Sequence, residues 1–360
     1  MFLNLDRQTW KHIIFRVILV AIGSFMVLYY GMPKEKKVQN HGKDVQTIMF
    51  TAMSTFFSAQ LATDAKKYPF DHAFDTIRYE FRKVEKVCNY FDPASELSRL
   101  NATAHEKPFV CSKDLWEIIT LSREWYKKTD GAFDITITPL MKLWGFYTKN
   151  KKIPSEAEIQ AAKKLCGLDK VKFDDEKKTV FFPVKGMSLN FGGIAKGWAL
   201  DRAVAGLQKR HPEISEGFLN LGGNVITFGG EFKGGVRDPF DKKKVCAQVD
   251  INGSAAMSTS GNMERYVTIN GKQYGHIMNP ATGRPVSDRI SVTVLTDKGV
   301  ESDALSTAIF IKGYAFAAKF PSVKTLVIQK DAKDPEKLDI RQTGDCWTLD
   351  LPASKVKLSK

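Results

Sequence analysis

Strand-like and helix-like segments interleave along this chain without the regular strand–helix–strand rhythm that a parallel sheet requires. The first half carries two amphipathic segments, 68–90 and 112–128, in which apolar residues recur at helical spacing. The second half is dominated by short β-branched and aromatic runs with glycine-rich bends between them. This irregular order favours an α+β architecture over a doubly wound parallel sheet.

Short local signals place several turns and helix ends. Ser155 and Glu158 have capping-box spacing at the start of a predicted helix, and Gly167 is placed to end it. Asn270 and Gly271 suit the two central positions of a type I′ hairpin turn. Strands are predicted at 46–63, 170–174, 179–184, 217–230, 265–277, 289–296 and 324–330, with a turn at 92–101 and a loop at 129–146.

The N-terminal part of the chain differs in composition from the rest. Ile13–Met32 is a 20-residue apolar run whose one charge is Arg16, about the length that crosses a bilayer as a helix. A cleaved signal peptide is the alternative, but no small-x-small cleavage site follows the run, which favours an uncleaved anchor. The first cysteine is Cys88, which excludes an N-terminal lipid anchor, and lysines and arginines on both sides leave the orientation open.

The expected organisation is therefore a single folded domain behind one membrane anchor. A globular composition, 43% hydrophobic and 26% charged, supports one core of ordinary size. The predicted parts are a short N-terminal segment at 1–12, a transmembrane anchor at 13–32, a polar tether at 33–46 and the folded domain at 47–355.

The charge pattern argues against a nucleic-acid-binding protein, and the cysteine spacing argues against a cysteine metal site or redox site. The net charge is +14, but the lysines stand in short scattered clusters such as KEKK and DKKK. No basic helix with interleaved aromatics and no zinc-finger spacing is present, so nucleic acid is not the expected partner. The five cysteines lack metal-ligand or redox spacing and are expected to be mostly buried apolar residues, with one disulfide left open.

Three short motifs could carry chemistry. In ESDALSTAIF, residues 301–310, Asp303, Ser306 and Thr307 share one face of an apolar helix, where oxygen ligands could hold Mg²⁺; the alternative is that Asp303 caps a helix beginning at Ala304. In LNFGGIAKGWALD, a Gly-Gly turn enters a helix, with Lys196 just inside. That geometry suits a phosphate, and simple close packing of the glycines is the alternative.

The third motif is YGHIMNPATGRPV. His276 follows a predicted strand and precedes a turn, and its side chain could act as a base near neutral pH. A structural histidine is the alternative. The turns in SGNMERY and GAFD expose polar and aromatic groups, which ordinary loops also do.

Six stretches together resemble the successive signatures of the FAD:protein FMN transferases, the ApbE family. They are GAFDITITPLMKLWGF, LNFGGIAKGWALDRAV, LNLGGN, STSGNMERY, HIMNPATGRPV and ESDALSTAIF, and DPASELSRLN resembles the segment after the family's first long helix. The resemblance covers about residues 47–330. It implies an α+β domain that binds FAD and Mg²⁺ and transfers the FMN moiety to a Thr or Ser hydroxyl of a partner protein, releasing AMP.

The resemblance also implies a location, a class of partner and a set of site residues. It places the domain at the periplasmic or exterior face of the inner membrane, with an acceptor such as a subunit of a membrane electron-transfer complex. Metal ligands are implied at Asp303 and Thr307, with Ser306 beside them and a backbone carbonyl at Gly193. Cofactor contacts are implied at Met53, Phe91, Ala132, Phe133, Asp134, Asn190, Lys196, His276 and Ile277.

Two positions depart from the family pattern. Ser54 stands where the family has the glycine of M-G-T, and Asn190 stands where it has aspartate. Either change could weaken binding of FAD or metal or slow the transfer. The expected catalytic residues are His276, which would accept the hydroxyl proton, and Asp303, its rival for that role. An Mg²⁺-dependent FAD pyrophosphatase and a non-catalytic, membrane-tethered FAD-binding protein remain alternatives.

Overall fold

The computed structural model describes residues 42–148, 151–241, 243–262, 264–331, 333–334, 337–351 and 356–358. The membrane anchor predicted at 13–32 lies outside these residues. Within the described ranges, no helix has the length and apolar content that crossing a membrane requires. Strand pairing begins at Asp44 and includes Val356–Leu358, so the folded part extends beyond the predicted limits of 47 and 355 at both ends.

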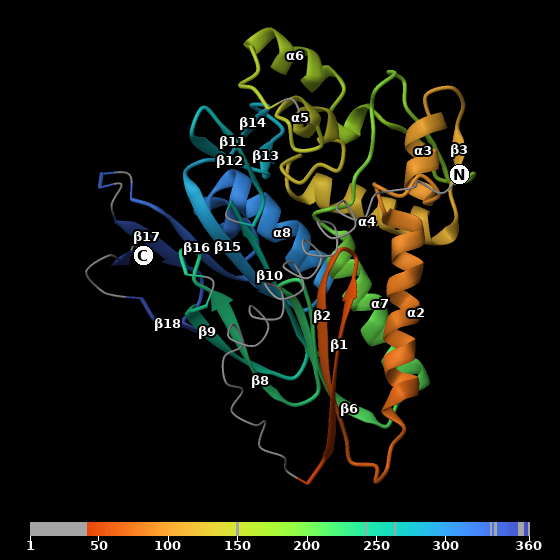
Figure 1. Ribbon diagram of the computed structural model, residues 1–360, viewed down its shortest axis with the longest axis vertical. Helices are drawn as coiled ribbons and strands as arrows, with labels where there is room; N and C mark the ends of the chain where they lie inside the picture. The colour runs from red at the N-terminus through yellow and green to blue at the C-terminus, as the bar shows by residue number, and fades with distance from the viewer. Residues whose placement is uncertain are drawn as a thin grey trace, which may run out of the picture.

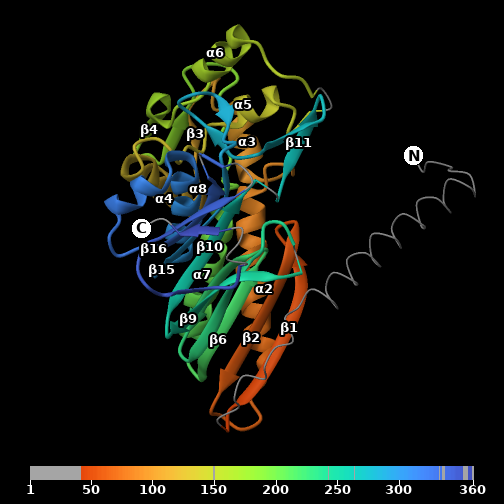
Figure 2. The same ribbon diagram turned by 90° about the vertical axis from the view of Figure 1, so that its left-hand side faces the viewer.

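A large sheet runs through the centre of the domain (Figures 1 and 2). Among the described residues it has nine strands, and all neighbours are antiparallel except the last pair, which is parallel. In spatial order they are β1 (Asp44–Ala52), β2 (Thr55–Thr63), β6 (Ile214–Leu221), β7 (Asn224–Phe228), β10 (Ala255–Gly261), β15 (Arg289–Thr296), β16 (Lys324–Lys330), β17 (Leu338–Gln342) and β19 (Val356–Leu358).

Both faces of the central strands are covered. Helices α2 (Phe70–Cys88), α7 (Ala195–Arg210) and α8 (Gly299–Lys312) pack on one face and enclose the main hydrophobic core. A three-stranded sheet, β18 (Trp347–Leu349), β9 (Val245–Asn252) and β8 (Glu231–Arg237), covers the other face over a second core. Strand β15 is therefore buried almost throughout, which explains why its sequence, RISVTVLT, is an apolar run without strict alternation.

Smaller elements gather at one end of the molecule, around the short helices α5 (Thr138–Leu143) and α6 (Glu156–Lys164) (Figure 1). Short helices α5 and α6 share a third hydrophobic cluster with hairpin β11–β12. The elements are α3 (Glu96–Thr103), β3 (Phe109–Val110), α4 (Lys113–Lys128), α5 (Thr138–Leu143), α6 (Glu156–Lys164), η1 (Leu168–Lys170), β4 (Lys172–Asp174), β5 (Thr179–Phe181), β11 (Tyr266–Ile269), β12 (Lys272–Gly275), β13 (Met278–Asn279), β14 (Arg284–Pro285) and η2 (Tyr314–Lys319).

The α+β class and most of the strongly patterned elements are confirmed. The capping box of α6 is present, and Asn270 and Gly271 both have positive φ in the β11–β12 turn. Two segments predicted as irregular contain helices instead. Helix α3 begins after Ser95, whose side chain accepts a hydrogen bond from the Ser98 N–H, and α5 carries a proline in its first turn, where proline is tolerated.

None of the five cysteines forms a disulfide. Cys88, Cys111, Cys166 and Cys246 are buried, which confirms their prediction as apolar interior residues, and Cys346 is half-buried. Burial raises the pKa of the Cys166 and Cys246 thiols to about 12. These side chains are therefore uncharged thiols at neutral pH and are poor nucleophiles.

The hairpin turn between β1 and β2 places two non-glycine residues in the left-handed region. Met53 has φ of 50° and Ser54 has φ of 59°, in a two-residue turn closed by the Ala52–Thr55 pair. A type I′ turn requires positive φ at both central positions, which glycine adopts most readily. The Met53 N–H donates to Glu85 Oε1 at 2.6 Å, so the turn is tied to α2 despite its backbone strain.

We expect Ser54→Gly to raise the free energy of unfolding by about 0.5–1 kcal/mol. Relief of the left-handed strain, about 1–2 kcal/mol for a residue with a Cβ, exceeds the entropy that glycine adds to the unfolded chain. Urea denaturation measures the change. Ser58→Gly in the middle of β2 is the control and is expected to destabilise, because glycine weakens a strand. A lower midpoint for Ser54→Gly would contradict the strain argument.

Candidate functional site

A buried carboxylate lies where the starts of α7 and α8 meet. Asp303 is 5% exposed, and its Oδ2 accepts a hydrogen bond of 3.0 Å from the Gly197 N–H. Its Oδ1 lies 3.5 Å from Lys196 Nζ. Because α8 begins at Gly299, Asp303 stands in its second turn, and the alternative that it caps a helix beginning at Ala304 is wrong. It satisfies a free N–H group at the start of α7 instead.

A hydroxyl and a glycine backbone adjoin this carboxylate. Thr307 lies one turn further along α8, and its Oγ1 lies 3.4 Å from both the Asp303 carbonyl oxygen and Ser260 Oγ. A Cβ added to Gly193 would stand 3.4 Å from the same Oγ1. The structure thus brings together Asp303, Thr307, Gly193 and Lys196, as the sequence predicts.

Ser306 is less accessible than its neighbours on the helix face. It is 1% exposed, donates to the Asp303 carbonyl oxygen at 2.9 Å and shares a 2.9 Å hydrogen bond with Ser260 Oγ on β10. Its hydroxyl therefore ties α8 to the sheet. Sequence reasoning did not single out Ser260, although it stands in the STSGN motif one residue before a glycine.

The donor set fits a hard divalent cation. The buried Asp303 carboxylate requires a positive partner, and the half-buried Lys196 ammonium occupies that position in the structure. Thr307 and the Gly193 backbone supply neighbouring oxygens. Mg²⁺ prefers oxygen ligands and often takes only one or two carboxylates, with water and phosphate completing its shell. In the part of the chain that the structure describes, no group of three or more His, Cys, Asp or Glu could hold a metal.

The Gly-Gly turn before α7 is partly satisfied by the protein itself. The Gly192 N–H donates to Asn190 Oδ1 at 2.8 Å, and the Ala195 N–H donates to the Phe191 carbonyl oxygen at 2.8 Å. Two of the N–H groups at this turn are thus engaged within the protein, and anion binding by the turn stays a prediction. Lys196 carries the positive charge at this helix start. The Asn190 amide also accepts the hydrogen bond that an aspartate in its place would accept.

His276 is held in one tautomer. Its Nδ1 lies 3.1 Å from the Arg265 carbonyl oxygen, which can only accept, so Nδ1 carries the proton and Nε2 has a free lone pair. Burial lowers the pKa of His276 to about 4, and the positive charges of Arg265 and Lys196 act in the same direction. The imidazole is therefore neutral at pH 7.

An exposed aromatic cluster adjoins Asn190. Phe91 is 66% exposed and makes edge contacts with Tyr90 and Tyr147, at ring-centroid distances of 5.4 and 5.5 Å. The Arg265 guanidinium lies 4.9 Å from the Tyr147 ring centre, and the Asn190 amide lies 3.4 Å from the Tyr147 hydroxyl. Such a surface suits a flat aromatic ligand. Tyr147 and Arg265 were not predicted as site residues. The only hint in the sequence was an aromatic side chain in GFY and a cationic side chain in MERY.

The predicted loop 132–134 contributes apolar packing next to Gly193, and its charged residue, Asp134, is bonded within the loop. Ala132 and Phe133 are buried, and the Phe133 ring would lie 3.3 Å from a Cβ on Gly193. Asp134 Oδ1 accepts hydrogen bonds from the N–H and the hydroxyl of Thr136. Burial raises the pKa of Asp134 to about 6. This carboxyl therefore organises its own loop.

The two remaining predicted contacts are apolar. Met53 lies in the β1–β2 turn and packs against the main core as a partly buried side chain. Ile277 is 5% exposed, and its carbonyl oxygen accepts from the Val286 N–H. Both residues thus pack in the hydrophobic core of the domain.

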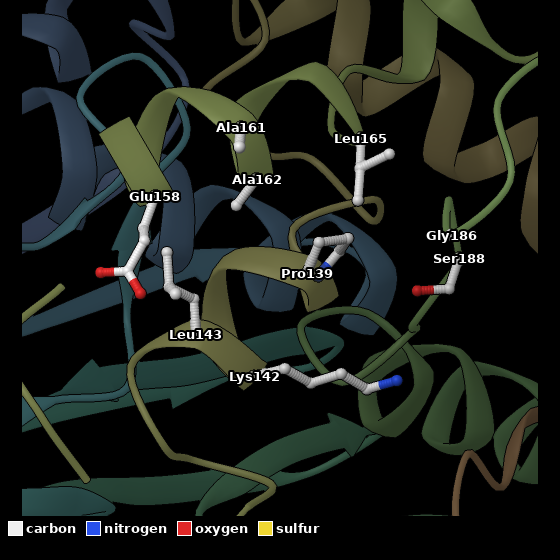
Figure 3. Close-up of a pocket in the computed structure, with 9 residues that line it drawn as sticks. All are labelled: Pro139, Lys142, Leu143, Glu158, Ala161, Ala162, Leu165, Gly186 and Ser188. Carbon is white, nitrogen blue, oxygen red and sulfur yellow. The ribbon is translucent and has the colours of Figure 1, made fainter. Parts of the chain in front are cut away.

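A groove is lined by residues of α5, of α6 and of the segment at 186–188 (Figure 3). It has a volume of about 550 Å³. Four of its nine lining residues are alanine or leucine, and Glu158 is already engaged by Ser155 and Lys152. Lys142 and Ser188 are its other polar side chains (Figure 3). None of the predicted site residues lines this groove, so we assign the site from its chemistry instead.

This chain is similar in sequence to known proteins over most of its length. A model described as the ApbE family matches residues 53–326. The chain is 31% identical to an FAD:protein FMN transferase of Klebsiella pneumoniae over 248 residues, 68% of this chain and 77% of that protein. It is 29% identical to one of Escherichia coli K12 over 310 residues, 83% of this chain and 86% of that protein.

Solved structures share the fold. The ApbE protein of Thermotoga maritima superposes with a TM-score of 0.73 at 29% identity, covering 79% of this chain and 94% of that one. The flavin transferase ApbE of Vibrio cholerae gives a TM-score of 0.72 at 23% identity, over 84% and 98% of the two chains, which concerns the fold alone. The family model spans more than half of the sequence, and we conclude that this chain belongs to the ApbE family.

Proposed function

We propose that this chain is an FAD:protein FMN transferase that uses Mg²⁺ and releases AMP. The observation that carries the proposal is the buried Asp303 carboxylate between α7 and α8, with Lys196, Thr307 and the Gly193 backbone around it. The names of the curated relatives support the same activity. A Thr or Ser hydroxyl of a partner protein is the proposed acceptor of the FMN moiety.

The residues around Asp303 have distinct proposed tasks. Lys196 binds and orients the negatively charged pyrophosphate of FAD, leaving the Asp303 oxygen that it now faces. Asp303 and Thr307 would hold Mg²⁺, which would neutralise charge on the pyrophosphate and on the departing AMP. The exposed Phe91 and its neighbour Tyr147 would stack against a ring of the substrate.

His276 is the proposed acceptor of the hydroxyl proton. The acceptor oxygen bonds to the FMN-side phosphorus, the bond to the AMP-side oxygen breaks, and the hydroxyl proton moves to Nε2. The neutral tautomer described above leaves that lone pair free. A carboxylate that binds a cation is a weaker base, which favours His276 over Asp303 for this step.

The pH dependence follows from the lowered pKa of His276. The unfolded chain binds a proton at this residue below about pH 6.5, whereas the folded protein binds it only near a pKa of about 4. Keeping His276 neutral in the folded protein therefore costs no stability above about pH 6.5. As the pH falls from there towards the folded pKa of about 4, the unfolded chain takes up the proton first and the folded protein becomes less stable. We expect urea midpoints to fall less steeply between pH 6.5 and 4.5 in His276→Asn than in the natural protein. If the urea midpoints of the two proteins change with pH in parallel, the lowered pKa of His276 is wrong.

The decisive experiment incubates the purified protein with FAD, Mg²⁺ and a candidate acceptor. Intact mass of the acceptor and chromatography of the nucleotides measure the products. Covalent FMN on the acceptor with an equal amount of AMP supports the proposal. Free FMN and AMP without modified acceptor would identify an FAD pyrophosphatase, and intact FAD bound to the protein would identify a flavin-binding protein. A subunit of a membrane electron-transfer complex is the first acceptor to try.

We also propose that residues 13–32 anchor the domain in the inner membrane, facing the periplasm or exterior. The support is the length and apolar composition of this run and the lack of a cleavage site after it. N-terminal sequencing of the mature protein tests the anchor, and a protein that begins after residue 30 would refute it. Protease digestion of intact and permeabilised cells tests the orientation.

A further inference from the structure

We propose that Asp201 is a positioning residue for the Asp303 site, because it fixes the start of the helix that carries Asp303. The inference rests on the proposed function. Asp201 stands on α7, and its two carboxylate oxygens accept hydrogen bonds from the first turn of α8. Oδ1 accepts from the Gly299 N–H at 2.7 Å, and Oδ2 accepts from the Val300 N–H at 2.9 Å.

The arrangement is reciprocal. Asp303 on α8 accepts from the Gly197 N–H in the first turn of α7, and Asp201 on α7 accepts from the first turn of α8. First-turn N–H groups have no partner within their own helix. A negative side chain at this end also interacts favourably with the helix dipole. Each helix therefore supplies the carboxylate that completes the start of the other.

Helices α7 and α8 cross in close backbone contact at Gly197 and Gly299. A Cβ added to Gly197 would lie 2.0 Å from the Gly299 carbonyl oxygen, and one added to Gly299 would lie 2.4 Å from the Gly197 carbonyl oxygen. The two backbones are thus in direct contact between the two carboxylates. A shift of the first turn of α8 would move Asp303 relative to Gly197 and Lys196, because Asp303 follows that turn directly.

Asp201 is not among the residues proposed to bind FAD or Mg²⁺, so its effect on binding can be measured apart from its effect on stability. Asp201 contacts neither Lys196 nor Thr307 through any hydrogen bond or ion pair recorded for the described residues. Burial raises the pKa of Asp201, whereas its hydrogen bonds from the Val300 and Gly299 N–H groups act in the opposite direction. Its effect on the site therefore passes through the backbone of α8.

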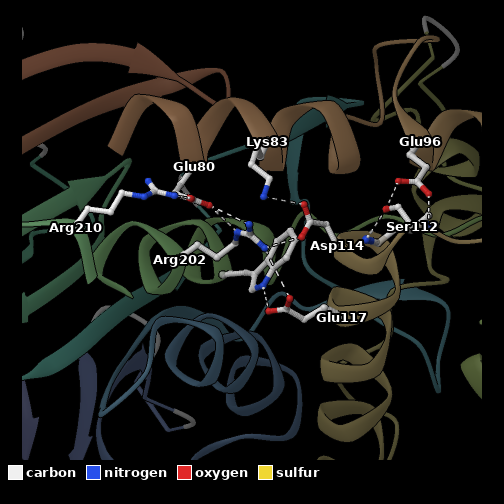
Figure 4. A network of polar contacts seen from close by, with 10 residues as sticks. Glu80, Lys83, Glu96, Ser112, Asp114, Glu117, Arg202 and Arg210 are labelled. Atoms are coloured by element: carbon white, nitrogen blue, oxygen red, sulfur yellow. Dashed lines mark hydrogen bonds and ion pairs between the residues drawn. The ribbon is translucent and has the colours of Figure 1, made fainter. Parts of the chain in front are cut away.

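A matched control exists at the start of another helix. Glu96 is 9% exposed and accepts from the N–H and the hydroxyl of Ser112, at 2.7 and 2.6 Å, where α4 begins (Figure 4). Like Asp201, it is a carboxylate that stabilises a helix start through a backbone amide. Glu96 has no hydrogen bond to α7 or α8 among the described residues. Asp201→Asn and Glu96→Gln are the matched pair, since each keeps its size and one acceptor oxygen.

The experiment compares three properties of both variants: the urea midpoint, the hydrogen exchange of the first amides of α8, and the FAD affinity with and without Mg²⁺. We expect both midpoints to fall by similar amounts. Only Asp201→Asn should speed exchange at Gly299 and Val300, and only it should weaken the Mg²⁺-dependent gain in FAD affinity, by about 10- to 100-fold. Higher Mg²⁺ should recover FAD binding in Asp201→Asn but not in Asp303→Asn, which lacks the ligand charge.

The outcomes separate this inference from the proposed function. Equal midpoints with unchanged FAD binding in Asp201→Asn would reduce Asp201 to a structural cap and overturn the inference. Absence of FMN transfer by the natural protein would overturn the proposed function, whereas amide exchange and FAD affinity would still decide the role of Asp201. If Asp201→Asn does not fold, slow exchange of the α8 amides in the natural protein supports the tie, and fast exchange overturns it.

Discussion

Replacing Asp303 by asparagine is expected to lower FMN transfer by at least about 100-fold in a protein that still folds. The asparagine oxygen can still accept the hydrogen bond from the Gly197 N–H, so the start of α7 keeps its partner. The negative charge that would hold Mg²⁺ is lost, and charge stabilisation of several kcal/mol corresponds to more than about a hundredfold in rate. Transfer rates and urea midpoints measured on one preparation separate the two effects.

Two further variants sharpen this test. Asp303→Ala should lose the same activity and, in addition, about 0.5–2 kcal/mol of stability, because the Gly197 N–H is left without its acceptor. Asp250→Asn is the charge-matched control, since its carboxylate is exposed and pairs with Lys233 on the surface. It should leave activity unchanged. Near-normal transfer by a folded Asp303→Asn protein would mean that Asp303 is only a structural cap.

Local signals predicted the helices and hairpins well. The apolar spacing in 68–90 and 112–128 gave α2 and α4, and the Ser155–Glu158 box marked the start of α6, because these signals depend on residues within one or two turns. Strand β8, with sequence EFKGGVR, was missed. Two adjacent glycines weaken a strand signal, and its pairing with β9 supplies the stability that its own sequence lacks.

The site was predictable only in part. The resemblance named the residues around Asp303, but the partner of its carboxylate is a backbone amide 106 positions away in the sequence. No local pattern reveals that contact, and the same limit hid Asp201, whose amide partners lie 98 and 99 positions away. At the Gly-Gly turn, the Asn190 amide oxygen accepts a hydrogen bond from the Gly192 N–H, a local side-chain contact that the motif alone did not reveal.

The second large expected effect concerns a charged network between α2, α4 and α7 (Figure 4). Arg202 donates to Glu80 at 2.9 Å and to Asp114 at 2.9 Å, and its guanidinium lies 5.0 Å from the Trp198 ring centre. The Glu80 side chain is only 7% exposed and that of Arg202 is 16% exposed. Arg210, which is 44% exposed, adds a longer contact of 3.3 Å to Glu80.

We expect Arg202→Met to lower the free energy of unfolding by about 3–5 kcal/mol, because it leaves the buried Glu80 carboxylate without its main partner. Arg210→Ala, the control, should cost less than about 1 kcal/mol, since an exposed ion pair contributes little. Urea denaturation at neutral pH measures both. A loss for Arg202→Met no larger than that for Arg210→Ala would show that water or Arg210 already solvates Glu80.

The origin of the loss can be tested by removing the charge that Arg202→Met leaves behind. If the unpaired carboxylate causes the instability, then adding Glu80→Gln should recover part of the lost stability, although Glu80→Gln alone destabilises the natural network. If lost packing of the Arg202 stem on Trp198 is the cause instead, the second substitution recovers nothing. In either case FAD affinity in the surviving folded fraction should stay near normal, because this network joins α2, α4 and α7, whereas Asp303 lies where α7 crosses α8.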